Sequence, residues 1–152
     1  MEPETANWLD YLKASCALPV MYRNALQING EALMDGGVVD SIPVKEAYRR
    51  GARRIVVIRS QIADYVKKKG VETKIVSFIF RKNANFVKAV KKRAQRYMEA
   101  VSFINNSPRD AQIIQLAPER PLYTSRTSQD LDALNADYQL GLKQGQMLVG
   151  QF

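Results

Sequence analysis

The sequence contains no histidine and a single cysteine, Cys16. The absence of histidine excludes a catalytic triad with a histidine base, a histidine metal ligand and an imidazole pH switch. One cysteine cannot form an internal disulfide or a thiolate zinc site, and its neighbours match no cysteine-nucleophile signature. A reducing compartment is the simplest interpretation. We expect Cys16 to be a small buried apolar residue.

Long apolar segments and a basic leader are also missing. The longest apolar runs, such as residues 55–58, are far too short to span a bilayer. The first five residues are acidic, which is the reverse of the basic start of a signal peptide. These features predict a cytoplasmic protein, with peripheral attachment to a membrane left open. We expect no metal and no organic cofactor.

The chain of 152 residues is long enough for one domain with a sizeable core. Hydrophobic residues make up 46% and charged residues 25%, which is a globular composition. Lys and Arg number 23 against 15 Asp and Glu, so the formal charge is +8. Such a charge attracts nucleic acid, anionic lipid or acidic protein, and charge alone does not choose among them.

The hydrophobic pattern predicts an α/β fold with a largely parallel sheet flanked by helices. Four β-branched residues at 55–58 indicate a strand covered on both faces. Residues 71–80 fit either a strand or a buried helix, and periodicity does not decide. In the last helix the buried side is expected at Leu131, Leu134, Tyr138, Leu142 and Leu148, with Gly141 and Gly145 packed closely against a neighbour. The expected elements are a helix at 5–14, a hairpin at 25–34 turning at Asn29-Gly30, a helix at 43–50 stopped by Gly51, a strand at 53–58, a helix at 83–104, a strand at 111–116 and a helix at 130–149.

One block of the sequence carries a family resemblance. Ala14-Ser-Cys-Ala-Leu-Pro19 is followed by the turn at Asn29-Gly30, by Asp35-Gly-Gly37 and by Gly51-Ala-Arg-Arg-Ile-Val-Val-Ile58. This order resembles the C-terminal part of the patatin-like phospholipases, which have an A-S-x-A-x-P segment, a D-G-G or D-G-A motif and a G-A-x-x-I-V-V-I strand. The block covers about a third of the chain.

The resemblance implies a lipid acyl hydrolase, a carboxylic ester hydrolase with a Ser–Asp dyad, in which Asp35 is the catalytic base. A serine hydroxyl is a weak nucleophile until an adjacent base takes its proton, and a carboxylate can serve in a chain without histidine. Gly36 and Gly37 are expected to let the backbone turn so that Asp35 is presented at a strand end.

The sequence departs from the family at the nucleophile. No serine has glycine two residues away on both sides, so the G-x-S-x-G motif is absent, and so is the family's glycine-rich oxyanion loop. We therefore expect residues 1–152 to be the C-terminal part of a single patatin-like domain, with an incomplete sheet. The chain alone is expected to be inactive, to need the N-terminal half of the same protein and to self-associate through its exposed edge.

Plainer interpretations stand beside this one. Asp35-Gly-Gly37 is also a common turn sequence. Ser15 is expected to be a structural cap or turn residue, and Asp40 or Ser41 to cap the helix that begins near Pro43. The alternative function is a non-catalytic, basic membrane- or partner-binding module derived from a patatin-like protein.

The helix at 83–104 has a basic face. Seven positive charges lie between Arg81 and Arg96. This face is either solvated or a dock for anionic lipid headgroups. Nucleic acid is not the expected partner, because aromatic residues rarely interleave with the charges and no nucleic-acid motif is present. The residues proposed to dock on lipid are Lys88, Lys91, Lys92, Arg93 and Arg96.

Overall fold

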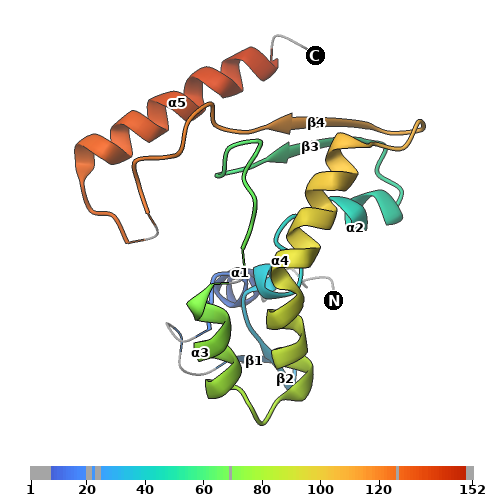
Figure 1. Cartoon of the computed structure of the whole chain (residues 1–152), viewed down its shortest axis with the longest axis vertical. Coiled ribbons are helices and arrows are strands. Elements are labelled where there is room, and N and C mark those ends of the chain that lie inside the picture. The colour runs from blue at the N-terminus through green and yellow to red at the C-terminus, as the bar shows by residue number, and fades with distance from the viewer. Residues whose placement is uncertain (1–7, 20–21, 23–24, 69, 126, 150–152) are drawn as a thin grey trace. The chain divides into compact units, whose positions relative to one another are not determined.

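A computed structural model describes residues 8–19, 22, 25–68, 70–125 and 127–149. The predicted α/β class is confirmed, with helices accompanied by two small sheets (Figure 1). The chain divides into two compact units. The first unit comprises residues 1–43 and 67–100, and the second comprises residues 44–66 and 101–152.

The first unit begins with helix α1 (Trp8–Ser15) and an antiparallel hairpin of β1 (Leu26–Ile28) and β2 (Glu31–Leu33). Asn29 and Gly30 form the turn with positive φ values of 51° and 78°. Two successive left-handed residues suit the twist of a tight hairpin. The predicted hairpin and its turn are therefore confirmed.

Helices α3 (Val71–Ile79) and the first part of α4 (Ala84–Asn105) complete this unit. The segment left open between strand and buried helix is thus a helix, and it carries exposed apolar side chains. The predicted helix at 83–104 is confirmed as α4, which buries Val90 and Tyr97. Phe80 and Phe86, either side of the turn between the helices, place their ring centroids 4.7 Å apart.

The second unit contains α2 (Val44–Arg49), β3 (Arg54–Ile58) and β4 (Gln112–Leu116). The two strands pair in parallel, with Arg54 opposite Gln112 and Ile58 opposite Leu116. Gly51 ends α2 with a φ of 100°, a left-handed conformation that favours glycine. The predicted helix, glycine stop and parallel strand are confirmed.

The expectation that β3 is covered on both faces is wrong. Val57 is buried, but Val56 is 42% exposed and Ile58 is 76% exposed. In the described residues α2 contacts β3 and α5 (Leu131–Val149) contacts β4, and these helices leave part of the two-stranded sheet uncovered.

A polar cluster joins the beginning of β3 to the beginning of β4. Asp110 accepts hydrogen bonds from the Tyr48 hydroxyl at 2.8 Å and from Arg53 Nε at 2.9 Å. The Arg53 guanidinium also lies 4.2 Å from the centre of the Tyr48 ring. The hydrogen bond to Tyr48 lowers the pKa of Asp110, and the same bond raises the pKa of Tyr48.

The prediction for the buried side of α5 is also wrong. Leu131 is 78% exposed and Tyr138 is 65% exposed, whereas the buried side chain is Gln144, which donates from Nε2 to the Ala117 carbonyl at 2.9 Å. Helix α5 packs through this polar side, so its apolar stripe remains outside. A Cβ on Gly141 or Gly145 would meet no atom within 4 Å, so close packing does not explain these glycines.

Asp137 anchors the loop before α5. Its carboxylate accepts from the backbone N–H groups of Tyr123 (3.2 Å) and Thr124 (2.9 Å), and from the Thr124 hydroxyl (2.8 Å). Arg120 adds an ion pair at 3.2 Å. Desolvation raises the pKa of Asp137, but the hydrogen bonds from Thr124, Tyr123 and Arg120 outweigh it and leave the pKa lowered.

Candidate functional site

Asp35 lies where β2 gives way to a single 3-10 turn, η1 (Gly36–Val38). Its backbone N–H donates to the Ala17 carbonyl at 3.1 Å. Ala17 is fully buried and follows α1 closely. The segment after α1 therefore fixes the backbone that carries the carboxylate, and the first segment of the motif block contacts the Asp35-Gly-Gly37 segment at this residue.

The Asp35 carboxylate is half-buried and its two oxygens differ. Oδ1 accepts a hydrogen bond from the Gly37 N–H at 2.7 Å, which caps the 3-10 turn. Within the described part of the chain, no hydrogen bond reaches Oδ2. One oxygen therefore orients the side chain, while the other is left to accept a proton from an incoming group.

The two glycines act differently from the prediction. Neither Gly36 nor Gly37 has a positive φ, so the turn does not require glycine for its backbone angles. Instead, a Cβ on Gly37 would lie 3.1 Å from Asp35 Oδ1, whereas a Cβ on Gly36 would meet nothing within 4 Å. Gly37 thus makes room for the carboxylate, and Gly36 leaves open space beside it.

Two arginines of α4 hold the loop that begins at Asp35. Arg93 Nε donates to the Gly37 carbonyl at 2.9 Å, and Arg96 Nη1 donates to the Val39 carbonyl at 3.1 Å. The Ser41 hydroxyl also donates to the Gly37 carbonyl, at 2.8 Å. Charged donors make stronger hydrogen bonds than neutral ones. The position of the Asp35 loop in the first unit therefore depends on α4.

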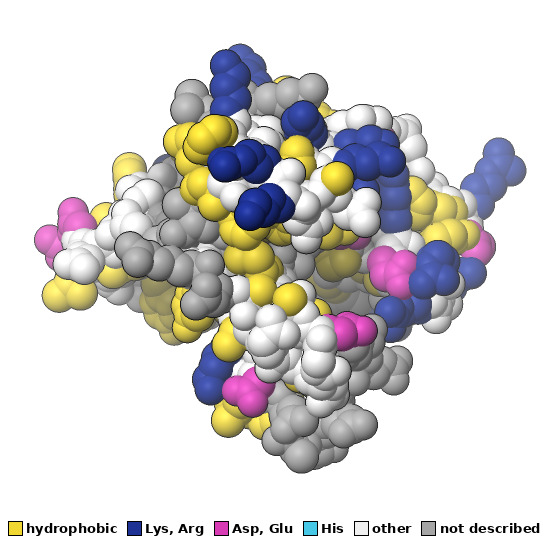
Figure 2. Space-filling view, turned by 90° about the horizontal axis from the view of Figure 1, so that it is seen from below, with side chains coloured by type: hydrophobic (Ala, Val, Ile, Leu, Met, Phe, Trp, Pro, Cys, Tyr) yellow, Lys and Arg dark blue, Asp and Glu magenta, His cyan; other side chains and the backbone are white. Residues whose placement is uncertain are grey.

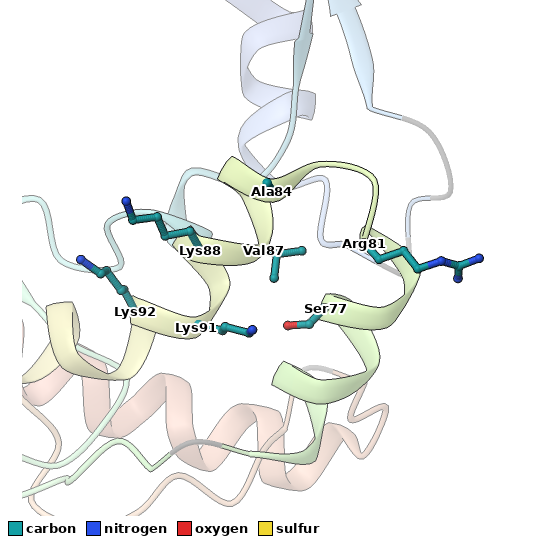
Figure 3. Close-up of a pocket in the computed structure, with 7 residues that line it drawn as sticks. All are labelled: Ser77, Arg81, Ala84, Val87, Lys88, Lys91 and Lys92. Carbon is teal, nitrogen blue, oxygen red and sulfur yellow. The ribbon is translucent and has the colours of Figure 1, made fainter.

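The five residues predicted to dock on lipid fall into two groups. Arg93 and Arg96 are half-buried and bind the carbonyls of the Asp35 loop. Lys88, Lys91 and Lys92 are exposed. These three line a groove of about 610 Å³ between α3 and α4 (Figure 3). Arg81, counted in the basic face from the sequence, also lines the groove, together with Ser77, Ala84 and Val87. Sequence reasoning missed the arginine contacts and the position of Ser77 in the groove, because neither follows from local spacing.

Three predictions about neighbouring residues have clear outcomes. Ser15 is structural, because its hydroxyl donates to the Leu12 carbonyl at 2.8 Å within α1. Cys16 is exposed, so the expectation of burial is wrong; Ala14 and Ala17 take the buried positions at the end of this helix. Asp40 does not cap α2, because its Oδ1 accepts from the Ile42 N–H at 3.3 Å, ahead of the helix.

Ser41, the other residue predicted to cap α2, uses its hydroxyl on the Gly37 carbonyl instead. The helix begins at Val44, and both candidates stabilise the loop ahead of it. Across the described ranges no group of three His, Cys, Asp or Glu residues could hold a metal ion. In the part of the chain that the structure describes, no helix is both long and apolar enough to cross a membrane.

Two family matches divide the sequence. Residues 2–48 match the family described as patatin-like phospholipase, and residues 83–151 match a domain of unknown function, DUF6363. The first range includes the Asp35 loop, and the second includes the whole of α4. The hydrogen bonds from Arg93 and Arg96 therefore join residues from the two matched ranges within the first unit.

One curated relative extends across both ranges. The chain is 32% identical over 140 residues to "Uncharacterized protein YjjU" of Escherichia coli strain K12. The alignment covers 91% of this chain but 39% of the length of that protein. No solved structure matches the chain. A relationship to patatin-like phospholipases is thus supported for the region that carries Asp35.

Proposed function

We propose that this chain supplies the base of a Ser–Asp dyad that hydrolyses carboxylic esters in lipids, with Asp35 as that base. The match of residues 2–48 to patatin-like phospholipases carries the proposal. The geometry supports it, because Asp35 Oδ1 is fixed by the Gly37 N–H at 2.7 Å while Oδ2 faces no described donor. A base needs such a fixed orientation and a vacant lone pair.

The proposed reaction has two steps. Asp35 takes the proton of a serine hydroxyl as its oxygen attacks the ester carbonyl, and it returns that proton to the departing alcohol. The resulting acyl-serine is then hydrolysed by water, whose proton Asp35 accepts and passes back to the serine. The glycines beside Asp35 suit this role, since open space adjoins Gly36 and a side chain on Gly37 would crowd the carboxylate.

The nucleophile is proposed to come from outside the 152 residues. No serine in the sequence lies in a G-x-S-x-G motif, and the chain spans 39% of the length of its E. coli relative. A serine on a strand-to-helix turn, with an oxyanion site of backbone N–H groups, is what such a hydrolase requires. We therefore expect ester hydrolysis in the longest protein that the gene encodes, because that protein would contain the serine.

The test is Asp35→Asn in that longest product, assayed on a phospholipid and on a soluble short-chain ester. Asparagine keeps an oxygen that can accept from the Gly37 N–H, so the loop is expected to remain intact. Loss of a general base lowers kcat by about 10²- to 10⁴-fold. The matched control is Asp40→Asn, which changes a half-buried carboxylate in the same loop whose Oδ1 accepts from the Ile42 N–H.

Equal activity in Asp35→Asn and the wild type would contradict the proposal. So would ester hydrolysis by the purified 152-residue chain that depends on Asp35, because that chain is expected to lack the nucleophile. The second candidate function, a non-catalytic binding module, is favoured by the exposed lysines between α3 and α4. It predicts that Asp35→Asn has no effect on function.

A further inference from the structure

The groove between α3 and α4 is strongly cationic. Four of its seven lining residues carry a positive charge. Lys88, Lys91 and Lys92 are exposed, and among the residues described by the structure no carboxylate pairs with any of them. The lining residues are Ser77, Arg81, Ala84, Val87, Lys88, Lys91 and Lys92.

A polar group without a partner lies among these charges. The Ser77 hydroxyl oxygen is buried and has no hydrogen-bond partner among the described residues. Figure 3 shows it pointing from α3 toward Lys91 on α4. A buried hydroxyl without a hydrogen bond is costly, and an anionic oxygen between Ser77 and Lys91 would satisfy both groups.

Exposed apolar side chains lie on α3, and one of them contacts a cation. On α3, Phe78 is 68% exposed, Ile79 is 51% exposed and Ile75 is 49% exposed. The Arg81 guanidinium lies 4.9 Å from the centre of the Phe78 ring, so charge and apolar surface meet directly. Figure 2 views the molecule from this end and shows Lys and Arg side chains beside hydrophobic ones.

We infer that this α3–α4 surface docks the protein on anionic membranes, with the cations on lipid headgroups and the α3 side chains among the acyl chains. It consists of Ile75, Ser77, Phe78, Ile79, Arg81, Lys82, Lys88, Lys91 and Lys92. Cations next to exposed apolar groups are the combination that binds an anionic bilayer interface. Branched aliphatic residues such as Ile75 and Ile79 suit acyl chains and offer no stacking face to a nucleic-acid base.

The inference does not depend on ester hydrolysis, because vesicle binding needs no catalysis. Of the five residues predicted from the sequence to dock on lipid, Arg93 and Arg96 are removed, because they bind the Asp35 loop. Lys88, Lys91 and Lys92 are kept. Arg81 and the exposed apolar residues of α3 are added to these three lysines in the proposed surface.

The experiment measures binding of the 152-residue chain to phosphatidylcholine vesicles with and without phosphatidylglycerol. Wild-type binding is expected with the anionic lipid and is expected to fall as salt increases. Each lysine near an anionic surface contributes about fivefold to partitioning, so Lys88→Gln/Lys91→Gln/Lys92→Gln is expected to lose on the order of 100-fold. Phe78→Ser is expected to weaken binding while leaving its salt dependence unchanged.

The control for net charge is Lys68→Gln/Arg109→Gln/Lys143→Gln, which neutralises three exposed cations outside the groove. It is expected to bind like the wild type, and circular dichroism checks that every variant is folded.

Equal binding to both kinds of vesicle, or an equal loss in the control, would overturn the inference. Binding of RNA or DNA that depends on the three lysines, without binding to anionic vesicles, would overturn it too. An absence of vesicle binding by the folded wild-type chain would have the same consequence.

Discussion

Both compact units use an arginine to hold a loop by its backbone carbonyls, but over very different lengths of chain. In the second unit Arg59 donates to the Ile62 and Ala63 carbonyls at 3.1 Å each, three and four residues away, and to Gln115 Oε1 at 2.9 Å. In the first unit Arg93 reaches back 56 residues to the Gly37 carbonyl. Both arginines therefore join segments 56 residues apart, because Gln115 is as far from Arg59 as Gly37 is from Arg93. They differ in the loop that they hold, which is local for Arg59 and distant in the sequence for Arg93.

The two arginines also differ in their relation to the matched ranges, because Arg59 lies outside both, whereas Arg93 and Gly37 lie in different ones. The Asp35 loop comes from the range matched by patatin-like phospholipases, while Arg93 and Arg96 come from the range matched by DUF6363. The Asp35 loop is therefore held in place by hydrogen bonds from residues of the range matched by DUF6363. The Ile62 and Ala63 carbonyls and the Gln115 side chain, which accept from Arg59, belong to the second unit.

The largest stability effect is expected from Arg59→Ala. Arg59 is buried, 7% exposed, and its removal leaves two loop carbonyls and Gln115 without its donors. Losing hydrogen bonds from a charged donor to part-buried acceptors lowers the free energy of unfolding by about 3 kcal/mol. Urea unfolding of the 152-residue chain measures it, with the exposed Arg109→Ala as control. A loss equal to that of the control would show that Arg59 is not an anchor.

Arg93→Ala is expected to act on the proposed hydrolysis more than on stability. The substitution removes a half-buried donor from the Gly37 carbonyl, next to the N–H that orients Asp35 Oδ1. A small misplacement of a catalytic group lowers kcat about tenfold or more while KM changes little. The assay uses the longest product of the gene and a soluble short-chain ester, so that membrane docking does not contribute.

Two variants sharpen that experiment. Lys92→Ala changes the adjacent exposed cation and is expected to leave kcat unchanged. Arg93→Lys keeps a charged donor without the planar fork and is expected to be intermediate. A uniform loss of folded protein with unchanged kcat per folded molecule would assign Arg93 a purely structural role.

The comparison also shows what the sequence could predict. Local chemistry was sufficient for the hairpin at Asn29-Gly30, the helix stop at Gly51 and the parallel strand after it, because each depends on neighbouring residues. It was insufficient for the Arg93 contact, since nothing in the spacing of a basic helix specifies a carbonyl 56 residues earlier.

The errors have a common physical cause. Burial at Cys16 and Leu131 was expected from side-chain type and helical periodicity, but burial depends on which elements pack against the helix. The end of α1 buries Ala14 and Ala17, and α5 packs through Gln144. Gly37 shows the same limit at the candidate site, because its function follows from the position of the Asp35 carboxylate rather than from its own backbone angles.

The second unit is further expected to lose stability in acid through Asp137. Its pKa is lowered from the ordinary 3.8, so the unfolded chain binds the proton at a higher pH than the folded chain does. The stabilisation is complete above the unfolded pKa and is lost as the pH falls through the lower folded pKa. Tm measured from neutral pH down to about pH 3 is expected to fall more steeply in the wild type than in Asp137→Asn. Parallel curves for the two proteins would contradict this.

The smallest changes in the free energy of unfolding are expected from a glycine-to-alanine substitution in each unit. Gly141 lies inside α5 with nothing within 4 Å of a Cβ, so Gly141→Ala is expected to raise the free energy of unfolding by about 0.5–1 kcal/mol through helix propensity. Gly30 has a φ of 78° in the first unit's hairpin, and Gly30→Ala is expected to lower that energy by about 1 kcal/mol, because alanine is strained there. Urea unfolding measures both. A destabilised Gly141→Ala variant would indicate that another surface packs on the exposed face of α5, whereas a stabilised one matches a helix that buries only its Gln144 side.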